Sequence, residues 1–307
     1  MLNNQEHQAG ISIWNSKLQI VEVLNNNGEL LVDNMAEVYF NEFIDFVNDK
    51  EPKILSTLQS AFDELLLQGK FSSKNVSFTL PSSMFYLLQC PYESSLLPND
   101  LMEEFNWELQ LCMPHVNIKD TVLQFIEVNK PKLYRFSSAI IIITLRKYLH
   151  TINRFCKTNN LNLLFIDNCH LSAEKTLNNE NNNQEIMASI FISHKAASFL
   201  ISSEDSTIFF NNYFFNHISE LPDLINNELE ENENLLVTKE MIDVLYISGE
   251  DVSVNIVNAL GKKLEIEVVR SNPFENIKVS NAVKRSNSYL VKHNSFASAV
   301  GIAFRSN

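Results

Sequence analysis

Hydrophobic and polar residues alternate along two separated stretches of the chain, and each stretch predicts a run of antiparallel strands. In the first, residues 10–23 alternate on either side of a turn at Asn15-Ser16, and residues 29–33 predict a third strand. In the second, residues 186–215 predict three strands joined by short polar turns. The pattern therefore indicates two β-meanders, one in each half of the chain.

Apolar residues spaced three or four positions apart predict helices after each meander. These helices are expected at residues 54–68, 98–112, 145–158, 218–229, 253–260 and 296–304. Further strands are predicted at residues 75–80, 84–90, 122–128, 138–144, 161–166, 243–248 and 266–269. Gly69 and Gly261 are expected to end two helices and Pro91 to end a strand, whereas residues 40–46 fit either a strand end or a helix face.

Each half thus begins with three strands and continues with alternating helices and strands, which predicts an α/β protein of two related lobes. The polar segment NNENNN at residues 178–183 is the expected linker between them. The chain has 307 residues, of which 45% are hydrophobic and 20% charged, so each lobe can bury a core of its own.

The charge balance excludes one class of partner. The chain has 24 Lys and Arg residues against 37 Asp and Glu residues, a net charge of −13, and no basic patch is evident along it. Such a surface repels phosphate backbones and anionic lipids, so nucleic acid is not an expected partner. The first ten residues form neither a basic start nor an apolar run, so no secretory signal is expected and the protein is predicted to be cytoplasmic.

Several kinds of catalytic site lack their sequence signatures. The chain has six glycines, none spaced as in the phosphate-binding loops GxGxxG or GxxxxGK, which excludes a Rossmann or P-loop nucleotide enzyme. The cysteines and histidines, His170 and His194 among them, lack the spacing of metal ligands, and no serine lies in a GxSxG context. No metal site and no nucleophilic catalysis are therefore expected.

Six segments, in order along the chain, carry a resemblance to a known family. They are GISIWNSKLQIVEV (residues 10–23), FTLPSSMFYLLQCP (78–91), EEFNWELQLCMPHVNIKDTVLQF (103–125), AIIIITLRKYLHTINRFCKTNNLNLLFID (139–167), RSNPFENIKVS (270–280) and SFASAVGIAFR (295–305). Together they resemble PilM, a family of cytoplasmic type IV pilus assembly proteins in the actin-like ATPase superfamily, related to FtsA.

The resemblance implies an actin-like fold, with two ribonuclease H-like lobes and an inserted subdomain of the FtsA and PilM type. It places the first lobe core at residues 1–76 and the inserted subdomain at residues 77–160. Residues 161–183 would return to the first lobe and form the linker. Residues 184–307 would form the second lobe, with a reduced helical subdomain.

The resemblance also locates a nucleotide site whose characteristic residues have been replaced. The first phosphate hairpin of the family has Asp and Gly where this chain has Ser12 and Trp14, and the second has Asp and Gly where it has Phe191 and Ser193. The degenerate site comprises Ser12, Trp14, Asn15, Ser16, Ser193, His194, Gly249 and Glu250. A carboxylate to hold Mg²⁺ is missing from both hairpins, which predicts a pseudo-ATPase, not an enzyme, that uses no cofactor.

The alternative is a divergent actin-like ATPase that binds ATP and Mg²⁺ through hydroxyls and backbone amides. Ser12, Ser16, Ser193 and Gly249 would then hold the nucleotide. Trp14 has two interpretations, core packing and a binding platform, and the usual burial of Trp favours packing.

The resemblance further implies a non-catalytic scaffold of a type IV pilus or related secretion system. It would bind the short cytoplasmic N-terminal peptide of a PilN-like single-pass inner-membrane protein and contact the membrane only through that partner. The peptide groove would lie between the first lobe and the inserted subdomain, with Phe85, Tyr86, Trp107 and Phe125 as candidate lining residues. A filament-forming or adaptor protein is the remaining alternative.

Overall fold

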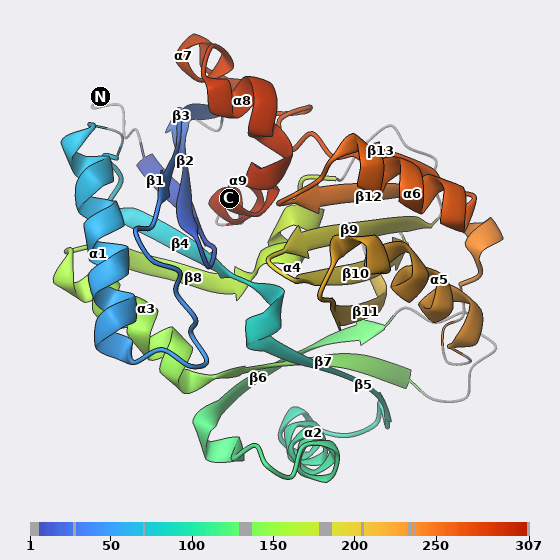
Figure 1. The fold of residues 1–307 in the computed structure, drawn as a ribbon. Helices are drawn as coiled ribbons and strands as arrows, with labels where there is room; N and C mark the ends of the chain where they lie inside the picture. The colour runs from blue at the N-terminus through green and yellow to red at the C-terminus, as the bar shows by residue number, and fades with distance from the viewer. Residues whose placement is uncertain are drawn as a thin grey trace.

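The computed structural model describes residues 6–26, 29–69, 71–128, 137–177, 186–203, 206–232, 235 and 237–305. Two large sheets form the cores of two lobes, and a third, smaller sheet extends from the first lobe (Figure 1). The fold is α/β, as predicted, and the meander that begins each lobe is present in both large sheets.

The first sheet has the strand order β14-β3-β2-β1-β4-β8. Its strands are β1 (Glu6–Ile13), β2 (Lys17–Asn26), β3 (Glu29–Tyr39), β4 (Asn75–Leu80), β8 (Asn162–Asn168) and β14 (Lys278–Val279). β1 to β3 pair antiparallel, whereas β4 pairs parallel to β1 and β8 pairs parallel to β4. The parallel pairing brings the C-terminal ends of β1, β4 and β8 to the same end of the sheet, and this end faces the second lobe.

Helices cover both faces of the first sheet because its strands are apolar on both sides. Leu18 and Ile20 of β2 belong to the core under α1 (Glu51–Leu67) and α3 (Arg146–Thr158). Val21 and Val23 of the same strand belong to the core under α9 (Ala297–Ala303). Gly10 allows the approach of α9 to β1, since a Cβ atom there would overlap the Ala299 carbonyl oxygen.

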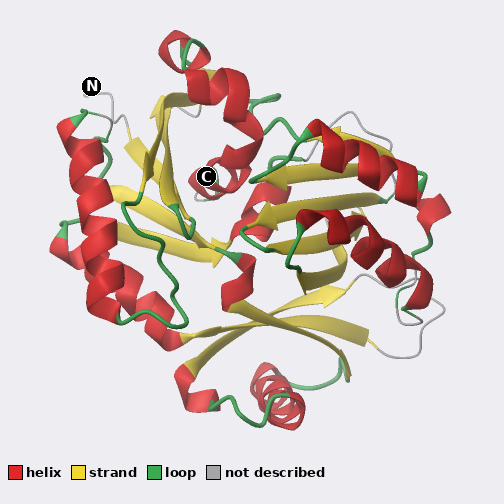
Figure 2. Ribbon diagram, in the orientation of Figure 1, coloured by secondary structure: helices red, strands yellow, loops and turns green. Residues whose placement is uncertain are grey.

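The second sheet has the order β11-β10-β9-β12-β13. Its strands are β9 (Met187–Ser193), β10 (Ala196–Ser203), β11 (Ser206–Phe214), β12 (Val244–Gly249) and β13 (Glu267–Arg270), and its outer helices are α5 (Leu221–Glu231) and α6 (Val254–Leu264). Figure 2 shows α1 with α3 and α5 with α6 as outer helical layers, whereas α9 and α4 (Cys169–Glu174) lie between the two large sheets.

The third sheet, β5-β7-β6, is the inserted subdomain, and α2 (Pro98–Cys112) covers its outer face (Figure 1). Its strands β5 (Phe85–Tyr92), β6 (Thr121–Val128) and β7 (Ser137–Leu145) pair antiparallel. The subdomain is therefore shorter than the expected residues 77–160, because β4 belongs to the first sheet and α3 packs into the core of the first lobe.

The C-terminal segment also departs from the expected boundaries, which assigned residues 184–307 to the second lobe. β14 pairs with β3, and α9 packs on the first sheet, so the end of the chain returns to the first lobe. Two short helices, α7 (Asn281–Lys284) and α8 (Asn287–Lys292), connect β14 to α9. These two helices, together with α4 and β14, were not predicted.

Three local expectations were wrong. Gly261 lies inside α6, which continues because Leu264 packs into the core and which ends at Glu265 in a left-handed conformation. Pro91 does not end β5, because β5 is an edge strand and the missing N–H of a proline is tolerated there. Residues 40–46 form neither a strand nor a helix.

Gly69 follows the end of α1, as predicted. The proposed linker at residues 178–183 lies outside the described residues.

Candidate functional site

The two hairpins at the degenerate site meet through a pair of stacked aromatic rings. Trp14 follows β1 in the first lobe, Phe191 lies in β9 of the second, and their ring centroids are 5.5 Å apart at an interplanar angle of 16°. Both side chains are buried, at 3% and 1% exposure, and Trp14 Nε1 donates to Gln19 Oε1 at 2.8 Å. Trp14 is thus a packing residue of the lobe interface, as the usual burial of Trp indicated.

The polar residues of the first hairpin are occupied by contacts within the protein. The Oγ atoms of Ser12 and Ser298 are hydrogen-bonded at 2.9 Å. Asn15 Nδ2 donates to the carbonyl of Ile44 at 2.9 Å, and the Ser16 carbonyl accepts from the amide of Phe40 at 2.7 Å. The hairpin therefore anchors the segment that follows β3.

The second-lobe residues of the site have structural roles of the same kind. Gly249 has φ of 102°, and a Cβ atom there would overlap the carbonyl oxygen of Ile192, so the close approach of β12 to β9 requires glycine. The amide of Glu250 donates to the same carbonyl at 2.9 Å. Ser193 is buried, and His194 is exposed with its ring 5.9 Å from that of Phe43. The surviving glycine is thus explained without a nucleotide.

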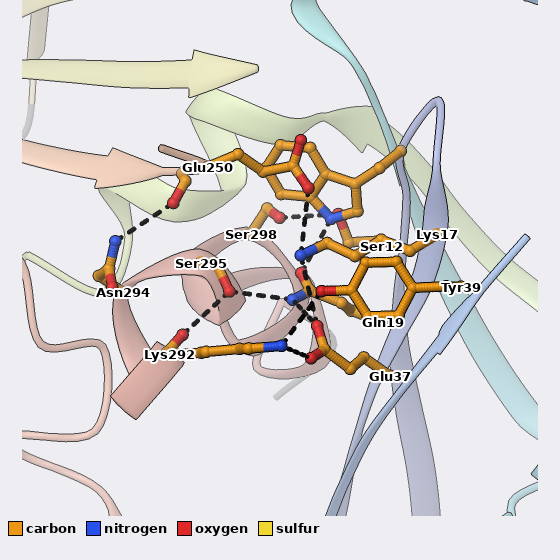
Figure 3. Close-up of polar contacts among 12 residues, drawn as sticks. Ser12, Lys17, Gln19, Glu37, Tyr39, Glu250, Lys292, Asn294, Ser295 and Ser298 are labelled. Atoms are coloured by element: carbon orange, nitrogen blue, oxygen red, sulfur yellow. Dashed lines mark hydrogen bonds and ion pairs between the residues drawn. The ribbon is translucent and has the colours of Figure 1, made fainter. Parts of the chain in front are cut away.

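A buried lysine connects the two lobes beside the aromatic pair (Figure 3). Lys17, at the start of β2, has a side chain that is 5% exposed, and its Nζ lies 3.3 Å from Glu37 and 3.1 Å from Glu250. It also lies 5.6 Å from the ring centroid of Trp14 and 5.5 Å from that of Tyr39. Because Glu250 belongs to the second lobe, this ammonium group joins the lobes through ion pairs.

Glu37 is the centre of this network. Burial alone would raise the pKa of its carboxyl, but the hydrogen bond from Lys292 and the charges of Lys17 and Lys292 hold that pKa below the ordinary value. Gln19 Nε2 lies within hydrogen-bond distance of Glu37, at 3.3 Å, and of Ser295 Oγ, at 3.0 Å. The network therefore includes first-lobe strands and the segment preceding α9, as Figure 3 shows.

A second buried network joins the lobes around His170 of α4. Its Nδ1 lies 2.7 Å from Ser198 Oγ and its Nε2 lies 2.9 Å from Ser189 Oγ, both in the second lobe. Burial lowers the pKa of the imidazole to about 3, so it is neutral at pH 7. Ser82 of the first lobe extends this hydrogen-bond network, since its Oγ lies 3.1 Å from the Oγ of Ser198. His170 is a satisfied core residue, as its lack of metal-ligand spacing indicated.

A small cavity beside Trp14 is lined by first-lobe residues, Asp45 and Pro81 among them, and measures about 30 Å³, which is enough for one water molecule. In the described part of the chain, no three His, Cys, Asp or Glu side chains gather as a metal site requires. The arrangement holds the two lobes together, and its two partly buried carboxylates, Glu37 and Glu250, are both paired with Lys17.

A larger cavity, of about 630 Å³, lies between the first lobe and the inserted subdomain. It is lined by Phe85, Val122, Gln124, Phe125, Ile126, Ile142, Thr144, Leu149, Leu163, Leu164, Phe165, Ile166, Asp167, Leu171, Glu174, Lys175, Thr207 and Arg305. We call this cavity the groove. Of the four residues expected here, Phe85 and Phe125 line it. Tyr86 and Trp107 do not, and Trp107 is 58% exposed on the outer face of α2.

Two strand edges border the groove. β8 is the last strand of the first sheet and β6 is the last strand of the third, so among the described strands each pairs with a neighbour on one side only. Consecutive residues line the cavity on both strands, 163–167 on β8 and 124–126 on β6. Because neighbouring residues of a strand point to opposite faces, such runs mean that the edges themselves border the space.

One side of the groove carries charge. Asp167 pairs with Arg305, whose guanidinium lies 5.5 Å from the ring centroid of Phe165. Burial and the nearby charge of Arg305 lower the pKa of Lys175. The groove is therefore an apolar channel with a polar margin, which is the usual character of a peptide or small-molecule site.

The sequence pattern did not identify Lys17, Gln19 and Glu37 as interface residues. The alternation of side chains along β2 contains a signal for two of them, because Lys17 and Gln19 share a strand face with Val21 and Val23. Charged and amide groups on an otherwise apolar face indicate buried polar partners. The identity of those partners was not available, because Glu250 and Lys292 are far away in the chain.

Comparison with protein-family models gives no match, and comparison with curated proteins gives none either. Among solved structures, the chain is similar to one chain of the PilM–PilN type IV pilus biogenesis complex, with a TM-score of 0.77 and 17% identity over 99% of this chain and 98% of that one. It is also similar to a Bacteroides thetaiotaomicron protein with an actin-like ATPase fold, with a TM-score of 0.51 and 14% identity over 89% of this chain and 93% of that one. The expected actin-like fold is therefore confirmed. None of the helices in the described ranges has both the length and the hydropathy needed to cross a bilayer.

Proposed function

We propose that this protein is a non-catalytic actin-like scaffold that binds an extended peptide in the groove between the first lobe and the inserted subdomain. The observation that carries the proposal is the groove itself, an apolar channel of about 630 Å³ bordered by the free edges of β6 and β8. An extended segment fits such a site, since strand edges supply main-chain hydrogen bonds and the channel accepts alternate apolar side chains.

The partner we propose is the short cytoplasmic peptide of a PilN-like, single-pass inner-membrane protein. The six sequence motifs and the similarity of fold to a chain of the PilM–PilN complex support this assignment. The protein would act at the cytoplasmic face of a type IV pilus or related secretion machine and would reach the inner membrane through that partner.

The absence of catalysis is the second part of the proposal. The resemblance puts the two phosphate hairpins at Trp14 and Phe191; their rings stack on each other, and the ammonium of Lys17 lies buried beside them. A nucleotide would have to displace a buried aromatic pair and separate buried ion pairs, which is energetically costly. Calorimetric titration with Mg-ATP and with ADP should give no heat of binding at millimolar nucleotide, and metal-dependent binding would instead support the ATPase alternative.

Peptide binding is tested with a fluorescent peptide that carries the cytoplasmic N-terminal residues of a PilN-like inner-membrane protein. We expect saturable anisotropy changes with the wild-type protein. Leu164→Glu places a carboxylate in the groove on the exposed edge of β8 and should weaken binding at least about tenfold by burying an unpaired charge. Leu67→Glu, at the exposed end of α1, is the matched control and should bind normally.

The outcomes separate the two parts of the proposal. Absence of saturable binding, or equal binding by wild type and Leu164→Glu, would contradict the peptide function and favour the adaptor alternative. A measurable heat of nucleotide binding would contradict the non-catalytic assignment but would not bear on the proposal that the groove binds a peptide.

A further inference from the structure

The charges on one side of the groove gather near the C-terminal end of β8. Asp167 lies at that end of the strand, Lys175 follows α4 and Arg305 follows α9, and all three line the cavity together with Glu174. Asp167 and Arg305 form an ion pair, and the three other charges all act on the pKa of Lys175, so the four groups lie close together. We call these four residues the charged end of the groove.

The groove is apolar near the start of β8. Leu149 of α3 and Leu163 of β8 line it there, and both also pack against the core of the first lobe. Leu163 and Asp167 are four residues apart on the strand, which corresponds to roughly 13 Å at the usual rise of a strand. A peptide extended beside β8 advances by the same rise, so the apolar part and the charged end face peptide residues about four positions apart.

The two cations of the charged end differ in their contacts. Arg305 is neutralised, because its guanidinium pairs with Asp167 and lies 5.5 Å from the ring centroid of Phe165. Lys175 is exposed, and within the described residues it forms no ion pair, with Glu174 or with any other carboxylate. Partial burial and the charge of Arg305 lower the pKa of its ammonium. A carboxylate added beside this ammonium offsets both effects.

We propose that Lys175 makes the groove selective for a peptide with an acidic side chain, Asp or Glu, about four residues from an apolar one. In this arrangement the apolar side chain lies beside Leu149 and Leu163, and Nζ of Lys175 donates a hydrogen bond to the carboxylate. The inference rests on the proposed function, because it names the chemistry of the peptide that the groove binds. The carboxylate belongs to a side chain, since the C-terminal side of the proposed peptide continues into the membrane protein.

The size of the selectivity follows from the exposure of Lys175. A Glu in the peptide adds an ion pair that a Gln of the same shape does not, and an ion pair of an exposed lysine raises the affinity by at least about threefold. This gain should decrease as salt rises from about 0.05 M to about 0.5 M, because salt screens exposed charges. At other peptide positions Glu should give no gain, since the protein has a net charge of −13.

The test measures the fluorescence anisotropy of labelled peptides titrated with the full chain. The parent peptide carries the cytoplasmic N-terminal residues of a PilN-like inner-membrane protein, and each of its residues is replaced in turn by Glu, by Gln and by Lys. Every peptide ends in an amide, so that a terminal carboxylate does not compete. Lys175→Gln removes the ammonium and Lys175→Glu reverses the charge. Lys157→Gln, at an exposed position of α3 outside the groove, is the matched control.

We expect one peptide position at which Glu binds the wild type and the control at least about threefold more tightly than Gln does. Lys175→Gln should bind the Glu and Gln peptides equally, and Lys175→Glu should prefer Lys to Gln at the same position. A purely structural role of Lys175 would change all affinities together and leave their ratio unchanged. The side chain is exposed, so thermal unfolding of the variants should match the wild type.

Two results would overturn this inference and leave the peptide function intact. One is equal binding of the Glu and Gln peptides by the wild type at every position. The other is a preference for Glu that persists in Lys175→Gln, which would assign the carboxylate to Arg305. If none of the peptides binds saturably, the proposed function fails, and the selectivity fails with it.

Discussion

Replacing Lys17 with methionine tests whether the buried ion pairs hold the two lobes together. The substitution keeps much of the apolar stem of the side chain and removes the ammonium that lies 3.3 Å from Glu37 and 3.1 Å from Glu250. Glu37 keeps its contacts with Lys292 and Gln19, whereas Glu250 loses the partner that links it to the first lobe. The change thus leaves one partly buried carboxylate without its cation.

The magnitude follows from burial. Removing one partner of a buried ion pair costs about 3–5 kcal/mol, but Glu250 is 18% exposed and Glu37 remains paired, which reduces the loss. The contacts of the ammonium with the rings of Trp14 and Tyr39 add about 0.5–2 kcal/mol. We therefore expect Lys17→Met to lower the free energy of unfolding by about 2–4 kcal/mol.

Urea unfolding at pH 7 measures this loss, and the sequence offers a local reporter. The chain has two tryptophans, and Trp107→Phe leaves the buried Trp14 as the fluorophore at the lobe interface. Glu250→Gln and the double variant complete a double-mutant cycle, with an expected coupling of about 1–3 kcal/mol. Arg154→Met, which removes an exposed ion pair with Glu51, is the control and should change stability by less than about 1 kcal/mol.

A loss below about 1 kcal/mol for Lys17→Met, or a coupling near zero, would refute this reasoning. Either result would mean that Lys17 is hydrated in solution and that ion pairs do not hold the lobes together.

Further predictions concern single positions, and each has its own measurement. Gly249→Ala should lower the free energy of urea unfolding by more than about 2 kcal/mol, because the positive φ and the overlap with Ile192 both oppose a side chain. Gly261→Ala, inside α6, is the control and should raise the free energy of unfolding by about 0.5–1 kcal/mol. Equal effects of the two substitutions would contradict the assignment of strain to Gly249. The folded-state pKa of His170 is about 3, well below its ordinary value of 6.5, so the unfolded chain takes up a proton that the folded protein excludes. Stability should thus fall as pH drops from about 6.5 towards 3, by up to about 5 kcal/mol, in pH-dependent urea titrations. Burial also lowers the pKa of His293, so His170→Gln should lose most of this slope above about pH 4.5 but not all of it. The exposed His194→Gln should keep the slope, and an unchanged slope in His170→Gln would contradict the prediction.

Local signals explain the elements that the sequence predicted well. Helix α2 has the predicted bounds because Pro98 starts it and a stripe of buried apolar residues continues to its last turn. The meanders are recognisable because alternation of polar and apolar residues has a period of two in any strand. The extension of α6 beyond Gly261 was missed because the burial of Leu264, a tertiary contact, outweighs the weak helix propensity of glycine.

The candidate sites also combine residues that the sequence identified with contacts that only the structure reveals. Ser12, Trp14, Phe191 and Ser193 were identifiable because the resemblance fixes their place within hairpins. The contact between Trp14 and Phe191 was not, since these residues are far apart in the chain and become neighbours only when the lobes meet. A cavity lies between the expected subdomains, but Tyr86 of β5 and Trp107 of α2 do not line it, because the period of a strand or a helix does not reveal which face borders a cavity.

The sequence by itself determined the order of most elements and the two-lobed plan, because both depend on residue type and short-range spacing. The tertiary structure decided the return of the C-terminal segment to the first lobe, the partner of Lys17 and the free edges beside the groove. These depend on contacts between residues distant in the chain, and the period of a strand or helix specifies which face is buried but not which surface will cover it.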